Sequence, residues 1–299
     1  MIEVDLNRRW VNQGTGEFKD DVDEVVTRQD NLARAENHQR QKDGWEYAKN
    51  EILPLPHFLQ EQFGNFIHSR YDSLLEKVNY DTATAFRFIY LCTFMEYDTG
   101  YIIWKNKKIN EHYLIDIFNV HKNTITPIKK KLFDYELIFK DNNGQIYVNM
   151  DYCYRGDISN NKSYRQQCTR IFNNGIQDLY NKTEDPRDHK MLGKLILILP
   201  YVNIYHNIIC MNTREKDFEK LVIPNVAQMD EILHTSHKNS GRQINMLLEM
   251  EVNGEPVVLV VNHKNTRMFA INPRVYYGGT RLSDVEELSG WFKVKGGLD

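Results

Sequence analysis

The sequence predicts a mainly helical α+β protein with small β-hairpins, built from two tandem copies of one domain behind an N-terminal helical and hairpin extension. Three observations lead to this prediction. Apolar residues recur at three- and four-residue steps in several segments, which is the spacing of helices with one buried face. Asn143-Gly144 lies between two apolar runs, which is typical of a β-hairpin. A pattern of residues between 110 and 156 returns in the second half of the chain, which indicates an internal repeat.

Size and composition fit two compact domains. The chain has 299 residues, of which 41% are hydrophobic and 26% are charged, so we do not expect wholesale disorder. The longest apolar stretch, residues 192–204, contains Lys194 and Pro200 and is too short to span a bilayer, so we expect no membrane partner. The four cysteines are widely spaced and form no Cys-x-x-Cys pair, which favours buried thiols in a reducing compartment, the cytoplasm.

Residues 1–56 form the predicted extension. Residues 8–20 have the pattern of a β-hairpin, and residues 28–49 are polar but compatible with a helix. Pro54 and Pro56 end that helix. The first 26 residues hold seven acidic residues against three basic ones, so the start of the extension is acidic.

Residues 57–160 form the first predicted domain, which begins with two helices and a strand. A helix over residues 57–78 has one apolar face. Asp81 is a suitable N-cap for a second helix over residues 82–96. A short apolar strand follows at residues 101–104.

The rest of this domain predicts a helix-turn-helix followed by a hairpin. Asn110 caps a short helix, residues 120–123 form a turn, and a further helix covers residues 124–135. Strands at residues 136–139 and 145–148 pair around the Asn-Gly turn. This order of elements is that of a winged helix-turn-helix, which we assign to residues 81–157.

The predicted recognition helix has the side chains that DNA contacts require. Such helices place short polar and cationic side chains at base edges in the major groove, while other cations meet phosphates. Residues 101–140 hold eight lysines against four acidic residues, although the net charge of the chain is −3. The candidate DNA-contacting residues are His121, Lys122, Asn123, Thr124, Thr126, Lys129 and Lys130 on the helix, and Lys140, Asn142 and Asn143 on the hairpin.

Two alternatives stay open for this domain. The lysines could solvate one face of a winged helix that binds another protein. His121 could be a turn residue bonded to the backbone.

Residues 186–299 form a second predicted copy, joined to the first by a linker at residues 161–185. The segment 237–240 echoes 121–124, and a helix over residues 190–201 corresponds to that over 82–96. Apolar Met229, Ile232 and Leu233 correspond to Leu114, Ile117 and Phe118. Strands at residues 257–261 and 268–271 form a second hairpin. Both copies then end alike, with Asn149, Tyr154 and Gly156 in the first and Asn272, Tyr277 and Gly279 in the second.

Two copies in one chain would form a covalent pseudo-dimer. The two recognition helices could contact two half-sites of DNA, or the second copy could be structural. The candidate DNA-contacting residues of the second copy are His237, Lys238, Asn239, Ser240, Arg242, Lys264 and Arg267.

The first copy resembles winged-helix proteins of bacterial plasmids and temperate phages, in particular the plasmid replication proteins of the RepL kind. The shared features are an apolar helix at residues 88–97, the helix-turn-helix at residues 110–132, and a hairpin that runs into Val148-Asn149 with a glycine shortly after. The resemblance covers residues 60–160.

The second copy extends beyond that resemblance. Members of the family usually have Asn-Pro where this chain has Asn149-Met150, whereas the second copy has Asn272-Pro273. The single-domain family leaves residues 186–282 unmatched, and tandem winged-helix plasmid initiators share the two-copy layout. The resemblance implies DNA binding in a mobile element.

The sequence does not predict an enzyme, a metal site or a cofactor. Residues 277–280 lack the lysine and the spacing of a phosphate-binding loop, and there is no dinucleotide-binding fingerprint. His234 and His237 have no evident third zinc ligand. No His-x-His pair is present, as a rolling-circle nickase would require.

The expected function is sequence-specific binding of double-stranded DNA by a transcriptional regulator of a phage or mobile element. One alternative is a replication initiator that binds origin repeats. Another is an interaction module that contacts host RNA polymerase or a helicase loader through the acidic N-terminus. Host RNA polymerase and replication proteins are therefore candidate partners beside DNA, and a homodimer is a further option.

Overall fold

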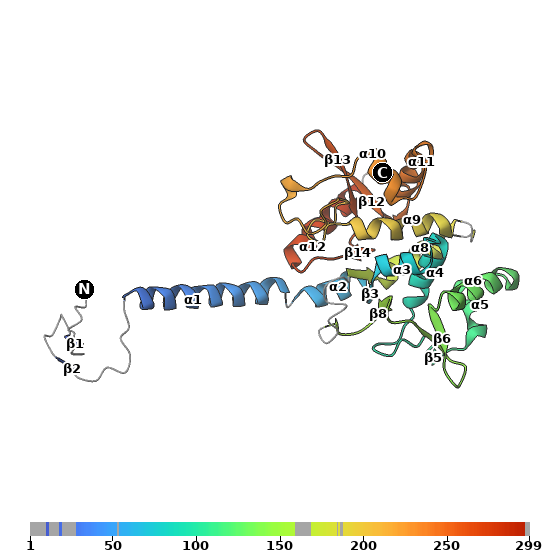
Figure 1. Ribbon diagram of the computed structural model, residues 1–299, viewed down its shortest axis with the longest axis horizontal. Helices are drawn as coiled ribbons and strands as arrows, with labels where there is room; N and C mark the ends of the chain where they lie inside the picture. The colour runs from blue at the N-terminus through green and yellow to red at the C-terminus, as the bar shows by residue number, and fades with distance from the viewer. Residues whose placement is uncertain are drawn as a thin grey trace. The chain divides into compact units, whose positions relative to one another are not determined.

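The computed structural model describes residues 10–11, 18–19, 28–52, 54–158, 169–183, 185 and 188–296, and it has two compact units, Met1–Asn50 and Glu51–Asp299 (Figure 1). In the first unit, β1 (Trp10–Val11) pairs antiparallel with β2 (Phe18–Lys19), as the predicted hairpin requires, and its turn lies outside the described residues. Helix α1 (Arg28–Tyr47) leads into the π-helical turn η1 (Ala48–Ile52). The described side chains of α1 are all exposed, as its polar sequence predicts.

The second unit is a mixed α+β structure with several small antiparallel hairpins. It opens with α2 (Leu55–Phe63), β3 (Phe66–Ser69) and α3 (Tyr71–Lys77), so the prediction of one helix over residues 57–78 is wrong. Gly64 ends α2 at a φ of 83°, a backbone angle that favours glycine. The four residues of β3 then pair with strands from distant parts of the chain.

The first repeat, residues 66–158, continues from α3 through a helix capped by Asp81, whose side chain accepts a hydrogen bond from the Thr84 amide at 3.2 Å. Its further elements are α4 (Thr82–Cys92), β4 (Ile103–Trp104), β5 (Lys107–Lys108), η2 (Glu111–Tyr113), α5 (Leu114–Phe118), α6 (Lys122–Asp134), β6 (Ile138–Lys140), β7 (Ile146–Val148) and β8 (Cys153–Tyr154). Strands β6 and β7 form the predicted hairpin, and Tyr101 bridges to Tyr147 along its edge.

The second repeat, residues 169–280, has a similar order of elements, except that the β4–β5 hairpin has no counterpart among its strand pairs and the β10–β11 hairpin is additional. Its elements are β9 (Thr169–Phe172), α8 (Asn173–Lys182), α9 (His189–Ile198), η4 (Leu199–Tyr201), η5 (Phe218–Lys220), α10 (Val226–Ile232), α11 (His237–Leu248), β10 (Glu251–Val252), β11 (Glu255–Pro256), β12 (Val258–His263), β13 (Thr266–Ile271) and β14 (Tyr276–Tyr277). The bridges Met95–Ile102 and Tyr101–Tyr147 of the first repeat return as Val202–Ile209 and Ile208–Ala270. A final helix, α12 (Leu282–Gly296), follows the repeat.

The two repeats end in matching hydrogen bonds. Asn149 donates its amide to Leu137 at 2.8 Å, and Asn272 donates to Val257 at 2.9 Å. Each asparagine side chain also donates to a backbone carbonyl at 3.0 Å and accepts from the amide two residues ahead. Gly156 and Gly279 each lie against the ring of the tyrosine two residues before, where a Cβ would clash. The recurring Asn, Tyr and Gly therefore form the same local hydrogen-bonding and packing arrangement at the end of each repeat.

Part of the segment expected as a linker, residues 161–185, is ordered into β9 and α8. Strand β9 pairs with β3 and β14, and α8 buries Ile176, Leu179 and Tyr180. Residues 159–168 lie outside the described residues. The structured part belongs to the second repeat because its strand completes a sheet that both repeats share.

That shared sheet has the strand order β14-β9-β3-β8, and the registers of its strand pairs indicate an approximate local twofold axis. His68 lies opposite Tyr154 on β8, and Arg170 lies opposite Tyr277 on β14, so His68 and Arg170 hold equivalent positions. These two residues also lie opposite each other across the antiparallel β3–β9 pair. Equivalent residues face each other in this way only about a local twofold axis.

Helices α4 and α9 pack against each other within one hydrophobic core that spans both repeats. A smaller core joins α2 and α12 to the β12–β13 hairpin, called the second hairpin below, as β6–β7 is called the first. This core includes Phe63, Leu259 and Phe292. Among the described residues, no helix is both long enough and apolar enough to cross a membrane.

Candidate nucleic-acid interface

Helix α6 presents one polar face to solvent. It buries Ile125, Ile128 and Leu132, and its opposite side exposes Lys122, Asn123, Thr126 and Lys130. No acidic residue occurs in its first turn. The positive end of the helix dipole therefore adds to the lysine charges, which favours an anion at this end.

Helix α6 starts two residues earlier than the sequence predicts, at Lys122, with His121 as its N-cap residue in extended backbone. Pro127 consequently lies inside the helix and cannot donate to the carbonyl of Asn123. His121 is exposed, and its side chain makes no capping hydrogen bond.

The other predicted residues of the first repeat differ in how available they are. Thr124 and Lys129 are half-buried, and the hydroxyl of Thr126 donates to the carbonyl of Lys122 at 3.2 Å. Lys140 forms an ion pair with Glu111 at 2.6 Å, and its hydrogen bond lowers the pKa of that carboxyl group. The charge of Lys140 is therefore partly neutralised within the repeat.

The tip of the first hairpin is held in a defined shape. Asp141 accepts hydrogen bonds from the amides of Asn143 at 2.9 Å and Gln145 at 2.8 Å, and from the Tyr101 hydroxyl at 3.2 Å. Asn142 and Asn143 are exposed at this tip. A fixed tip loses little conformational entropy when it meets a partner.

A second basic tip, which the sequence reasoning missed, lies on the neighbouring β4–β5 hairpin. Lys105 and Lys107 are exposed there, and Asn110 bridges to Gln145 beside the first hairpin. The signal was the run Lys105-Asn106-Lys107-Lys108, in which Lys105 and Asn106 adopt positive φ angles of 49° and 62°. Asn and Gly favour such turns, whereas lysine does not, so the turn was not recognised.

Helix α11 carries the corresponding face of the second repeat. Its N-cap residue is Ser236, and it exposes His237, Lys238, Asn239 and Arg242. His237 Nδ1 lies 3.0 Å from the Asp230 carboxylate. Ser240 is buried, and its hydroxyl donates to the carbonyl of His237 at 3.1 Å, so this side chain faces the core rather than solvent.

The second hairpin is longer, and the residues at its tip are tethered. Lys264 and His263 both contact the carboxylate of Glu219, the histidine at 2.9 Å, and their hydrogen bonds lower the pKa of Glu219. Arg267 is exposed, with its guanidinium 5.3 Å from the centre of the Phe269 ring.

The two helices correspond in a register that differs by one residue from the sequence echo. The N-caps His121 and Ser236 match, and the buried Ile125 and Leu132 match Ser240 and Leu247. Lys122 is therefore equivalent to His237, and Asn123 to Lys238. The alignment of residues 121–124 with residues 237–240 by sequence identity is therefore one residue out of register. The structural alignment follows the buried positions instead.

Comparison of the chain with known protein-family models, curated proteins and solved structures finds no match.

The described residues contain no group of three or more His, Cys, Asp or Glu side chains that could hold a metal ion. His234 stacks on the Tyr80 ring, with the ring centres 4.2 Å apart.

Proposed function

We propose that both repeats are winged helix-turn-helix domains and that the chain binds double-stranded DNA in a sequence-specific manner as a transcriptional regulator of a phage or mobile element. The observation that carries this proposal is the exposed face of α6. Lys122, Asn123, Thr126 and Lys130 lie together on a helix that follows a short helix and turn and precedes a hairpin. This is the side-chain chemistry and the element order of a recognition helix and its wing.

The side chains divide by what each can contact. The amide of Asn123 can pair with adenine in the major groove, and Lys122 can donate to guanine acceptors. Lys130, Lys105 and Lys107 are exposed cations suited to phosphates, which would position the domain without specifying sequence.

The local twofold arrangement of the shared sheet supports opposite orientations of the two recognition helices on the DNA. A protein with twofold-related recognition helices contacts two half-sites in opposite orientations. We therefore expect an imperfect inverted repeat, with half-sites separated by a whole number of helical turns of about 10 base pairs each. The half-sites would differ, because the equivalent positions carry Lys122 and Asn123 in one repeat and His237 and Lys238 in the other.

Selection of bound fragments from the source genome, followed by footprinting at several salt concentrations, tests the proposal. We expect two protected half-sites in inverted orientation and an affinity that falls steeply as salt rises, because bound lysines release counterions from phosphates. Binding that is absent, or insensitive to salt, contradicts the proposal. A protected site at an origin rather than a promoter would favour the replication initiator.

A further inference from the structure

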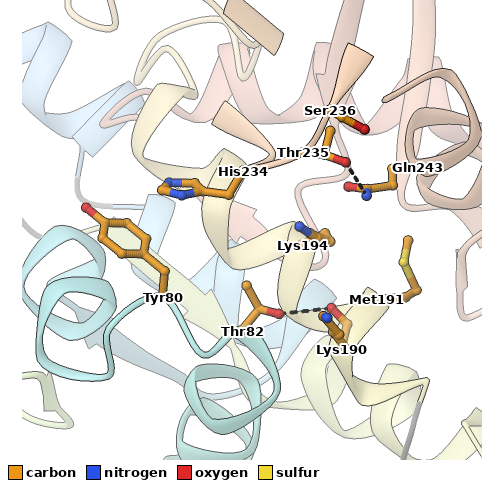
Figure 2. A pocket seen from close by; sticks show the side chains of 9 residues that line it. All are labelled: Tyr80, Thr82, Lys190, Met191, Lys194, His234, Thr235, Ser236 and Gln243. Carbon is orange, nitrogen blue, oxygen red and sulfur yellow. Dashed lines mark hydrogen bonds between the residues drawn. The ribbon is translucent and has the colours of Figure 1, made fainter. Parts of the chain in front are cut away.

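A pocket of about 530 Å³ lies between the two repeats, beside the start of α11 (Figure 2). Tyr80 and Thr82 come from the first repeat, and Lys190 and Lys194 come from α9. The turn before α11 and Gln243 on α11 close the other side. This volume is in the range of pockets that hold small molecules.

The pocket carries positive charge that no lining residue neutralises. Lys194 is only 6% exposed and donates to the carbonyl of Leu233 at 2.5 Å, and Lys190 is exposed beside it. None of the described residues that line the pocket is acidic. Burial lowers the pKa of Lys194, and the charge of Lys190 lowers it further. A buried ammonium group is costly without an anionic partner, so a bound anion would stabilise this arrangement.

Comparison of the two repeats explains why the pocket is open. The N-caps Asp81 and Asp188 align α4 with α9, so that Arg87 corresponds to Lys194 and His189 to Thr82. In the first repeat, the buried ring of His189 occupies the space beside the Arg87 guanidinium, and its Nδ1 lies 3.2 Å from Nε of Arg87. In the second repeat, the smaller Thr82 leaves that position over Lys194 empty.

The remaining polar groups define the rest of the ligand. Gln243 donates to the Thr235 hydroxyl at 2.7 Å, and its buried carbonyl oxygen has no hydrogen-bond partner among the described residues. That oxygen is shielded from solvent in this structure, so it can accept from a ligand hydroxyl or amino group only after the side chain turns toward the pocket. Thr82 and Ser236 add hydroxyl groups to the lining.

We propose that this pocket binds a small phosphomonoester that bears hydroxyl or amino groups, with its phosphate between Lys190 and Lys194 and a donor group at Gln243. Ser236 is the N-cap residue of α11 and Gln243 lies on this helix, so the bound ligand contacts the second recognition helix. The ligand therefore acts as an effector of the second repeat. This regulatory role rests on the proposed DNA binding, whereas the binding site itself does not.

Binding of ribose 5-phosphate to the full chain, measured by phosphorus NMR and calorimetry without DNA, tests the site. We expect saturable binding of ribose 5-phosphate, weak binding of inorganic phosphate and none of ribose. Lys190→Ala should weaken binding at least tenfold, because one of two phosphate contacts is lost. Lys293→Ala, which removes an exposed lysine from α12, is the matched control and should leave binding unchanged.

A second variant separates loss of the site from loss of the fold. Thr82→His places beside Lys194 the ring that His189 places beside Arg87, and it keeps both lysines. We therefore expect a protein that is folded, as thermal unfolding shows, and that does not bind ribose 5-phosphate. Equal affinity in this variant and the parent protein would overturn the proposal. Failure of the parent protein to bind ribose 5-phosphate would also overturn the proposal. If Lys190→Ala then weakened DNA binding, the pocket would instead bind a phosphate of the DNA backbone.

Discussion

His68 and Arg170 lie opposite each other on β3 and β9, and each holds the same position in its own repeat. His68 is buried and Arg170 is half-buried, and Arg170 donates to the carbonyl of Gly279 at 2.8 Å. The pair marks the approximate twofold axis, so the centre of the molecule joins a histidine and an arginine that cannot both be charged without cost.

The first prediction is a loss of stability in mild acid. The pKa of His68 is about 4 in the folded chain, against 6.5 ordinarily, because burial and then Arg170 disfavour the charged ring. The pKa of His189 is also about 4, because of burial and Arg87. Below pH 6.5 the unfolded chain therefore binds protons that the folded chain does not, and the free energy of unfolding falls as the pH falls toward 4. At about 1.4 kcal/mol per pKa unit, each ring contributes roughly 2–3 kcal/mol by pH 4.5.

Urea unfolding between pH 7 and pH 4.5 measures this effect. His68→Asn should flatten the dependence of the unfolding free energy on pH, whereas His57→Asn, at an exposed position, should not change it. A parent protein whose stability is constant over this range contradicts the prediction.

The second prediction concerns the contact of α4 with α9. A Cβ at Gly193 would lie 2.1 Å from the carbonyl oxygen of Thr82, so Gly193→Ala must push the helices apart. We expect a loss of about 2–3 kcal/mol in the free energy of unfolding. Gly241→Ala is the control within a helix, because nothing lies within 4 Å of its Cβ position, and it should raise stability by about 0.5–1 kcal/mol. Equal effects of the two substitutions in denaturant unfolding would refute the close packing.

The third prediction assigns the DNA contacts. Lys122→Ala with Asn123→Ala should abolish sequence-specific binding in a gel-shift assay while the fold is kept, because each good base contact is worth about 1–3 kcal/mol. The structurally equivalent change in the second repeat is His237→Ala with Lys238→Ala. Loss of one half-site from the footprint would show that α11 contacts DNA, and an unchanged footprint would leave the second repeat as a scaffold.

The fourth prediction concerns two glutamates that form ion pairs with lysines of the hairpins. Glu111 pairs with Lys140, and Glu219 pairs with Lys264. Glu111→Gln and Glu219→Gln should each raise DNA affinity and steepen its dependence on salt, because a lysine becomes available for phosphate and a repelling charge is removed. Glu61→Gln removes one exposed acid elsewhere and should have a smaller effect. Weaker binding in both hairpin variants would show that these ion pairs hold the hairpins in the shape that DNA requires.

Local signals in the sequence predicted the elements that local interactions determine. The N-cap at Asp81 and the Asn-Gly turn at residues 143–144 are satisfied by residues within four positions. Helix α4 begins where the sequence predicts, although it ends at Cys92 rather than at residue 96, and the β6–β7 hairpin forms around the predicted turn. The repeated Asn, Tyr and Gly were also visible, because each makes its contacts within its own repeat.

The errors arose where distant parts of the chain decide the outcome. Phe66 to Ser69 fit the apolar face of a helix, but the partners β8 and β9 convert them into a strand. Ser240 matches Thr124 in sequence, yet packing places it at the position of Ile125. Neither the strand nor the shift of register can be found from spacing alone.

The sequence by itself therefore indicated the helices and the hairpin whose caps and turns are local, the recurring Asn, Tyr and Gly, and the basic character of α6. Only the tertiary structure decided that the repeats share a sheet about His68 and Arg170, that Ser240 is buried, and that Thr82 leaves a space over Lys194. The reason is physical: capping and turn formation act between near neighbours, whereas strand pairing, burial and cavities depend on residues that meet only when the chain has folded.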